Sequence, residues 1–407
     1  MRTVRPQTTI LCLSVASSAT ACSGAPANVL HEREVTGSLG SPTLARNLAQ
    51  GDFDGDGVDD WAFGVGGDET DCSAGQVRLW YQVFDGDRPH EIWHRGMLEF
   101  SGNLCDANFG ASVAIGDFNG DDYDDLAVGV PGDFVDGQPN AGSIHVVYGS
   151  HRGLDVAANQ TFSQSSPGLA GSAKAGHAFG TALASGDFNC DGYADLAIGV
   201  PGEGANAGAL HVIFGTSEGL RGSGSQFLKY SPRASGSTAH YYGSFLAAGN
   251  INADHYGAWE CDDLAVGIPG EPESNASIPT TTATGRVAVI YGSGAGFEDI
   301  ETEISDHGDG FGRGVWIIDG NLDGYGDLLT YADGDDQFYW IYGTSTGLAS
   351  PTTYSHGKKQ VVQGKLRDAC VWACQLAWLL APPGPVCDCS GCEILTKTPS
   401  SPCPNCG

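Results

Sequence analysis

Aspartate and asparagine side chains recur in short clusters whose spacing suits the coordination of a divalent cation. The first cluster lies in GDFDGDGVDDWAFGVGG, which begins at Gly51, and its carboxylates stand at alternate positions. GDFNGDDYDDLAVGVPG follows from Gly116 and GDFNCDGYADLAIGVPG from Gly186, and a shorter copy, DGNLDGYGDLL, begins at Asp319. Numbered from its first aspartate, each loop offers side-chain oxygens at positions 1, 3, 5 and 9. With the backbone carbonyl at position 7 they would form a cage of hard oxygen ligands, as Ca²⁺ prefers.

Four of the loops contain a complete set of predicted calcium ligands. They share aspartate at positions 1, 5 and 9, and aspartate or asparagine at position 3. The four sets are Asp52, Asp54, Asp56, Val58 and Asp60; Asp117, Asn119, Asp121, Tyr123 and Asp125; Asp187, Asn189, Asp191, Tyr193 and Asp195; and Asp319, Asn321, Asp323, Tyr325 and Asp327. The sequence therefore predicts about four Ca²⁺ sites.

A further loop, which starts at Gly249 and is fourth in chain order, departs from this spacing. It offers Asn250, Asn252 and Asp254, and an insertion separates these from Asp263. Because it has fewer charges and a broken spacing, we expect this loop to bind calcium weakly or to stay empty.

An EF-hand is the obvious alternative for an aspartate-rich loop, and the spacing excludes it. An EF-hand needs a bidentate glutamate at position 12 and a helix on each side. Position 12 is occupied by Phe63, Val128, Ile198 and Thr330 in the four complete loops, and a strand pattern follows position 9. Simple solvated turns would explain one Asp-Gly pair, but turn formation does not require so many acidic side chains in every copy.

Each acidic loop belongs to a longer repeat of about 65 residues, a length suited to one four-stranded propeller blade. An aromatic-glycine pair precedes the loop, as in Phe109-Gly110, Phe179-Gly180, Tyr242-Gly243 and Phe311-Gly312. Short runs such as VAIGDF, DLAVGV and IHVVYG are rich in Val and Ile and bounded by Gly and Asp, which indicates strands. The repeat predicts strand, acidic loop, strand, turn, strand, turn and outer strand.

The Phe-Gly pair, the Asp-rich loop and the Gly-Val-Pro-Gly segment together resemble FG-GAP repeats. Such repeats build the N-terminal β-propeller of integrin α chains and of many bacterial exported proteins. The resemblance covers about residues 38–350. It implies an all-β propeller, with five recognisable blades where the family usually has seven. It also implies that Ca²⁺ binds between two strands of a blade at the positions that match the motif.

The charge of the chain limits its partners. The 407 residues include 19 Lys and Arg and 49 Asp and Glu, so the formal net charge is 19 − 49 = −30. This balance excludes nucleic acid, whose phosphates need a basic surface, and excludes binding to an anionic membrane through basic residues. The partner expected for an integrin-like propeller is an extracellular protein or a glycan.

The N-terminus has the features of an export signal. Arg2 and Arg5 precede a short apolar run from Thr8 to Ala16, and Ala19-Thr20-Ala21 fits a small-residue cleavage site. The segment Ala19 to Cys22 resembles a bacterial lipoprotein box, so the chain is either secreted or anchored to the envelope by a lipid on Cys22. We therefore expect a signal peptide at 1–21, a linker at 22–37, the propeller at 38–357 and a tail at 358–407.

Export places the cysteines in an oxidising compartment, where disulfides form. Cys190 lies in the third acidic loop and Cys261 in the insertion of the fourth, and equivalent loops of neighbouring blades lie on one face. We expect a Cys190–Cys261 disulfide, and a second one between Cys72 and Cys105. The tail holds Cys370, Cys374, Cys387, Cys389, Cys392, Cys403 and Cys406. Disulfides, a zinc site and a loose chain all remain open there.

The sequence contains motifs that could be mistaken for a catalytic site. Residues 215–219 and 343–347 match the serine-hydrolase pattern G-x-S-x-G, but no helical pattern follows either copy, as the nucleophile elbow requires. We expect turns at both places. His145 and His211 occupy equivalent strand positions and are expected to be scaffold residues. The sequence favours a non-enzymatic binding or adhesion module. The alternatives are a structural envelope protein and the accessory propeller of a hydrolase or phospholipase-like system.

Overall fold

The computed structural model describes ten stretches of the chain, which are residues 47–65, 75–81, 91–98, 107–230, 240–270, 285–297, 301–304, 310–332, 337–349 and 355–356. Almost all of them belong to one compact unit that includes Ala45–Ser355. The predicted signal peptide, Cys22, the Cys72–Cys105 pair and the cysteine-rich tail lie outside the described residues. Among the described helices, none is long and apolar enough to cross a membrane.

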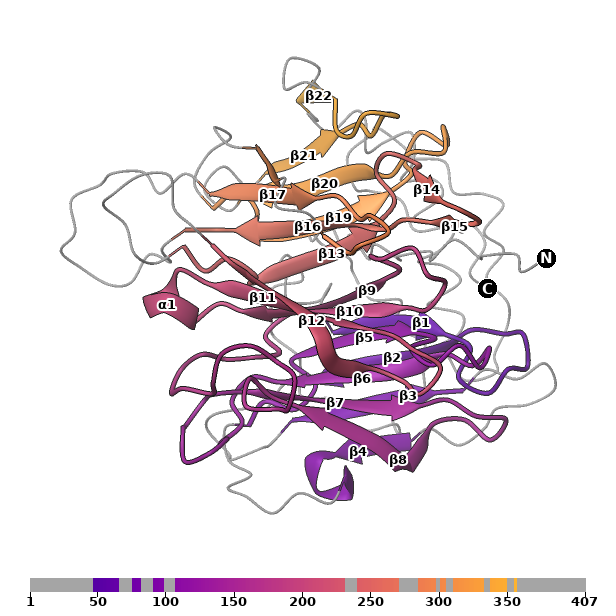
Figure 1. Cartoon of the computed structure of the whole chain (residues 1–407), viewed down its shortest axis with the longest axis vertical. Helices are drawn as coiled ribbons and strands as arrows, with labels where there is room; N and C mark the ends of the chain where they lie inside the picture. The colour runs from indigo at the N-terminus through magenta and orange to yellow at the C-terminus, as the bar shows by residue number, and fades with distance from the viewer. Residues whose placement is uncertain are drawn as a thin grey trace, which may run out of the picture. The chain divides into compact units, whose positions relative to one another are not determined.

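Five four-stranded antiparallel sheets, each formed from consecutive segments of the chain, make up the described fold (Figure 1). Blade one contains β1 (Leu48–Gly51), β2 (Asp60–Val65), β3 (Gln76–Trp80) and β4 (Glu91–His94), followed by the 3₁₀ helix η2 (Arg95–Leu98). Blade two contains β5 (Ser112–Gly116), β6 (Asp125–Val130), β7 (Ser143–Tyr148) and β8 (Asp155–Phe162). Blade three contains β9 (Leu183–Gly186), β10 (Asp195–Val200), β11 (Ala209–Phe214) and β12 (Arg221–Lys229), with the single turn α1 (Glu203–Asn206) between β10 and β11.

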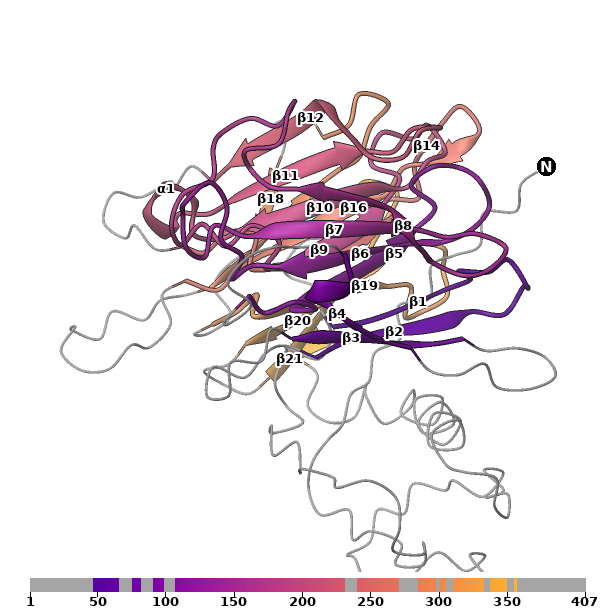
Figure 2. The ribbon, with the colours of Figure 1, turned by 90° about the horizontal axis from the view of Figure 1, so that it is seen from below.

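The last two blades follow the same plan. Blade four contains β13 (Phe245–Gly249), β16 (Asp263–Ile268), β17 (Arg286–Ile290) and β18 (Glu301–Ile304), and a hairpin of β14 (His255–Tyr256) and β15 (Trp259–Glu260) is inserted after β13. Blade five contains β19 (Gly314–Ile318), β20 (Asp327–Ala332), β21 (Gln337–Ile341) and β22 (Ser355–His356). The inner strands β1, β5, β9, β13 and β19 pack in chain order. Figure 2 shows the blades from below, coloured from indigo in blade one to orange in blade five. The predicted all-β propeller with five blades is confirmed.

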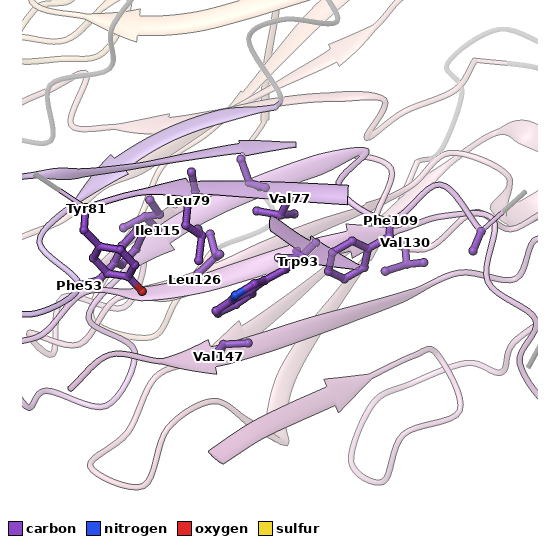
Figure 3. Packing of buried hydrophobic residues seen from close by; sticks show 14 residues of the cluster. Phe53, Val77, Leu79, Tyr81, Trp93, Phe109, Ile115, Leu126, Val130 and Val147 are labelled. Carbon is purple, nitrogen blue, oxygen red and sulfur yellow. The ribbon is translucent and has the colours of Figure 1, made fainter. Parts of the chain in front are cut away.

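The hydrophobic core lies between successive blades because the strands alternate their side chains. In β6, Leu126 and Val128 face blade one, whereas Ala127 faces blade three. Figure 3 shows the first of these interfaces, where Trp93 and Leu79 of blade one pack with residues of blade two. The second strands of blades two, three and four therefore present large aliphatic side chains to the blade before them and an alanine to the blade after them.

A glycine in the second strand of blades one to four allows the next blade to approach closely. A Cβ atom on Gly199 would lie 1.9 Å from the carbonyl oxygen of Gly243, which belongs to the aromatic-glycine pair of blade four. The same approach recurs between Gly64 and Gly110, Gly129 and Gly180, and Gly267 and Gly312, at 2.0, 2.2 and 2.1 Å. The glycine in the second strand of one blade and the glycine of the aromatic-glycine pair in the next blade therefore contact each other.

Replacing Gly199 by alanine is expected to reduce the free energy of unfolding by about 1–3 kcal/mol, because the new methyl group overlaps a backbone oxygen that cannot move without shifting the blade. Urea denaturation followed by circular dichroism measures the change. Gly96→Ala in η2 is the control, since a Cβ atom there would have no heavy atom within 4 Å. Equal stability of the two variants would contradict this account of the interface.

Candidate metal centre

The five acidic loops occupy the same place in each blade. They connect the inner strand to the second strand, at β1–β2, β5–β6, β9–β10, β13–β16 and β19–β20. Because the inner strands pack side by side in the same direction through the series, these loops lie at one end of the blades. Position 9 of each loop is the first residue of the second strand, as predicted, so a strand and not a helix follows it.

The side-chain oxygens of each loop fold the backbone around them. In the third loop, Oδ1 of Asp187 accepts the Asp191 N–H at 3.0 Å and Oδ2 accepts the Gly192 N–H at 2.8 Å. Oδ1 of Asn189 also accepts the Asp191 N–H, at 3.1 Å. Equivalent bonds form in the first, second and fifth loops. Positions 1 and 3 therefore direct oxygens toward the same point inside the loop in each copy.

The aspartate at position 9 has a second role in holding the blade together. Asp195 is fully buried, and its Oδ2 accepts the N–H of Phe188 at 2.9 Å while its Oδ1 accepts the N–H of Gly215 at 2.9 Å. Asp125, Asp263 and Asp327 bind the corresponding two amides of their own blades. This side chain links its loop to the turn after the third strand.

Three carboxylates converge in the first loop. Single oxygens of Asp52, Asp54 and Asp60 lie within 4.8 Å of one another, and Asp54 and Asp60 are buried. Two oxygens that bind the same Ca²⁺ can be at most about 5 Å apart, so this trio fits the ion. Among the described acidic and histidine residues, this is the one such convergence of three. Asp56 stands outside the trio, and its Oδ1 accepts the Val58 N–H at 2.8 Å.

In the second, third and fifth loops, asparagine replaces aspartate at position 3, so the corresponding trio contains two carboxylates and one amide oxygen. The amide nitrogen of each asparagine donates to the aspartate at position 5, as from Asn119 to Asp121 at 3.0 Å. The same bond forms in the other two loops. The predicted ligands of these loops thus keep the conformation of the first loop with one charge fewer.

Burial and mutual repulsion oppose ionisation of these aspartates. Burial is the larger cause and the carboxylates of Asp117 and Asp121 add to it, so that the pKa of Asp125 rises to about 8. Burial and the neighbouring Asp191 raise the pKa of Asp187 to about 6. Clustered carboxylates of this kind ionise fully when a cation neutralises them. The donor chemistry of the loops therefore fits a divalent cation held by hard oxygens.

The fourth loop keeps more of the common loop structure than its broken sequence spacing suggested. The insertion folds into the β14–β15 hairpin, so Asp263 still takes position 9 and accepts the Ile251 N–H at 2.8 Å. Asn250 and Asn252 keep the loop conformation by accepting the Asp254 N–H. Oδ1 of Asp254 is buried and has no hydrogen-bond partner among the described residues. Weak binding remains a prediction for this loop because it contains only two of the carboxylates.

The predicted disulfide between the third and fourth loops is confirmed. Cys190 and Cys261 are joined, with their Cα atoms 4.8 Å apart, and both residues are buried. The motif at residues 215–219 forms a turn that leads into β12 and not into a helix, as expected. His145 and His211 occupy equivalent buried positions in β7 and β11, which agrees with a scaffold role.

A buried polar cluster at the opposite end of blade three was not predicted from the sequence. Glu203, which follows the Pro-Gly pair, lies 3.0 Å from Nδ1 of His177 and 3.1 Å from Nζ of Lys229. Gln164 donates to Glu203 at 3.2 Å. An acidic residue also follows the equivalent Pro-Gly pair of blade two, where Asp133 accepts a hydrogen bond from Ser143. This recurrence was the signal that could have revealed the cluster.

Comparisons with known proteins agree with the repeat structure. The FG-GAP repeat family model matches residues 109–147 and 179–213. Phosphatidylinositol-glycan-specific phospholipase D of Bos taurus is 32% identical over 199 residues, which is 47% of this chain and 21% of that protein. Integrin alpha pat-2 of Caenorhabditis briggsae is 31% identical over 263 residues, 58% of this chain and 19% of that protein. Integrin alpha-V of Gallus gallus is 28% identical over 243 residues, which is 59% of this chain and 21% of that protein. The similar region spans about a fifth of each relative.

Proposed function

This chain carries FG-GAP repeats on an integrin-like β-propeller, and we propose that it is an exported, calcium-stabilised binding or adhesion module. The observation that carries the proposal is the repeated acidic loop. Its first copy brings three carboxylate oxygens within 4.8 Å of one another. Asp52, Asp54 and Asp60 would hold the ion there, together with the carbonyl of Val58 and with Asp56 after a small adjustment. Bound Ca²⁺ supplies the positive charge that allows the carboxylates to pack together.

The loops at the opposite end of the blades offer a surface for a partner. We define the connection face as residues 131–142, 163–182 and 201–208. Its segments are tied together, because the Gly176 N–H donates to Pro139 O at 3.0 Å and the Ala178 N–H donates to Asn140 O at 3.0 Å. Such cross-links reduce the entropy lost when a partner binds. The connection face is therefore the proposed position of the partner site.

Phe134 is the best candidate for an anchor on this face. Its side chain is 55% exposed and sits on a tight turn in which Val135 and Gln138 exchange backbone hydrogen bonds of 3.1 and 2.8 Å. Its own N–H donates to Oδ1 of Asp133 at 2.7 Å. Rigid exposed aromatic side chains contribute strongly to protein and glycan recognition.

The test is binding of the purified full chain to a glycan array and to a panel of extracellular matrix proteins, in Ca²⁺ and in chelator. We expect binding that requires Ca²⁺ and falls at least about tenfold in Phe134→Ser. Tyr256→Ser is the matched control, since Tyr256 is 64% exposed on β14 near the acidic loops. If no ligand binds, or if both variants behave as the parent does, the binding role at the connection face is rejected.

A second candidate function is that of an accessory propeller in a phospholipase-like system. The similarity to a phosphatidylinositol-glycan-specific phospholipase D, at 32% identity over 199 residues, supports it. Phosphatidylinositol-glycan is therefore included among the array ligands. Selective binding of this glycan would favour the accessory role, and binding of matrix proteins would favour adhesion. A structural envelope protein would bind neither.

A further inference from the structure

Each acidic loop is covered by the next loop along the chain. The ring of Tyr123, at position 7 of the second loop, lies on Gly55, at position 4 of the first loop. A Cβ atom on Gly55 would be only 2.6 Å from Cε1 of this ring. Tyr193 of the third loop covers Gly120 of the second in the same way, at 2.5 Å. Both glycines have positive φ, 72° and 73°, so the tight contact needs glycine at position 4.

A backbone link accompanies the aromatic contact. The Asp124 N–H, at position 8 of the second loop, donates to Asp52 O at 3.0 Å. The Oδ2 atom of Asp124 accepts the Asp52 N–H at 2.9 Å. Asp262 and Asp187 repeat both bonds between the fourth and third loops, at 2.9 and 3.0 Å. Thus the residue at position 8 of one loop, which lies between the predicted ligands at positions 7 and 9, forms hydrogen bonds with the position 1 aspartate of the loop before it.

The third loop replaces the aromatic contact with a covalent one. Its position 4 is Cys190, at φ 58°, and the insertion in the fourth loop removes the tyrosine that would cover it. The disulfide to Cys261 joins the two loops at this place. Trp259 of the inserted hairpin also lies on Gly192, where a Cβ atom would be 2.8 Å from its ring. The connection between successive loops is therefore preserved where its usual residues are missing.

The fifth loop is the last described loop, and its position 4 is uncovered. Leu322 occupies that position with φ 61°, and its side chain is 85% exposed. The covering is one-directional: the second loop covers the first, the third covers the second, and the fifth has no described loop after it.

We propose that neighbouring cation sites of the propeller are coupled, so that a cation in one loop raises the affinity of the loop before it. This inference rests on the proposed calcium binding. A cation in the second loop would fix Tyr123 through its backbone carbonyl, and would fix Asp124 between two ligands. Both residues contact the first loop, so ordering them prepares the first site. Linkage requires the effect to be reciprocal.

Calorimetric titration of the full chain with Ca²⁺ tests the coupling. Asp121→Ala removes a ligand from the second loop, and we expect it to lose that site and to weaken another site at least about fivefold. Tyr123→Ala keeps every ligand, because position 7 binds through its carbonyl. It should keep the number of sites and weaken one of them by a similar factor.

The fifth loop supplies matched controls. Asp323→Ala and Tyr325→Ala change equivalent positions in a loop that contacts the weak fourth loop, through the Gly326 N–H that donates to Asn250 O at 2.8 Å. They should therefore leave the affinities of the first three sites unchanged. The coupling is rejected if Asp121→Ala removes one site and leaves the others as they were, and if Tyr123→Ala binds as the parent does. An absence of Ca²⁺ binding in the parent chain rejects the proposed function itself, so the two failures are distinguishable.

Discussion

Chelation of divalent cations is expected to lower the melting temperature of this protein by about 5–10 °C for each site emptied. A site that is saturated 100-fold above its Kd stabilises the folded state by about 2.7 kcal/mol, and 1 kcal/mol shifts the melting temperature of a domain of this size by about 2–4 °C. Extracellular calcium sites have Kd values of about 10⁻⁴–10⁻³ M. The measurement is therefore a thermal scan in about 10 mM Ca²⁺ and in excess chelator.

The pH dependence provides an independent check on the same prediction. Burial and neighbouring carboxylates raise the pKa of Asp125 to about 8 and hold the pKa of Asp195 well above its ordinary value. Between pH of about 4 and 8 the cation-free folded state then binds more protons than the unfolded state. Its stability must fall as the pH rises through this window.

Bound Ca²⁺ favours the ionised carboxylates and removes this penalty. The difference in melting temperature between the loaded and the chelated protein should therefore be larger at pH 8 than at pH 5. A melting temperature that chelator leaves unchanged at both pH values would contradict the calcium sites.

Asp195→Ala is expected to destabilise the protein by about 2–6 kcal/mol, whether or not Ca²⁺ is present. The substitution leaves the buried N–H groups of Phe188 and Gly215 without the acceptor that now lies 2.9 Å from each. Each buried amide that loses its partner costs about 1–3 kcal/mol. Urea unfolding in Ca²⁺ and in chelator measures the loss.

Asp191→Ala separates this structural role from cation binding. Asp191 belongs to the same loop and is exposed, and it accepts two exposed hydrogen bonds, from the N–H of Tyr193 and from the side-chain amide of Asn189. In chelator we expect this variant to lose less than about 1 kcal/mol, whereas in Ca²⁺ it should lose the stabilisation of its site. If Asp195→Ala and Asp191→Ala lost the same free energy of unfolding in chelator, Asp195 at position 9 would have no role beyond cation binding.

Several features of the candidate site followed from local spacing. The alternate oxygens of Asp52 and Asp54 could be recognised because ligands in a nine-residue loop lie close together whatever the rest of the fold does. The strand after position 9 could be predicted from runs such as Asp125–Val130, where β-branched residues alternate with small ones. The Cys190–Cys261 pair followed once the loops were known to be equivalent, since equivalent loops of adjacent blades are neighbours.

Other features depend on segments that are distant in the sequence. The bond from Gly215 to Asp195 spans 20 residues, and the bond from Asp52 to Asp124 spans 72. No local pattern determines such pairings, because the first depends on how the strands of one blade fold together and the second on how far one blade is rotated and shifted against the next. The fourth loop also required the structure, because its inserted hairpin restores Asp263 to position 9 although the linear spacing is broken.

By itself, the sequence determined the repeat, the order of strands in a blade and the chemical type of the predicted ligands, because each of these is encoded within one repeating unit. Only the tertiary structure decided that Asp195 fastens its loop to a distant turn, that Tyr123 covers Gly55, and that the glycines of neighbouring blades meet. These are contacts between units or between the ends of one unit. Their geometry comes from the packing of whole sheets, to which every residue of the interface contributes.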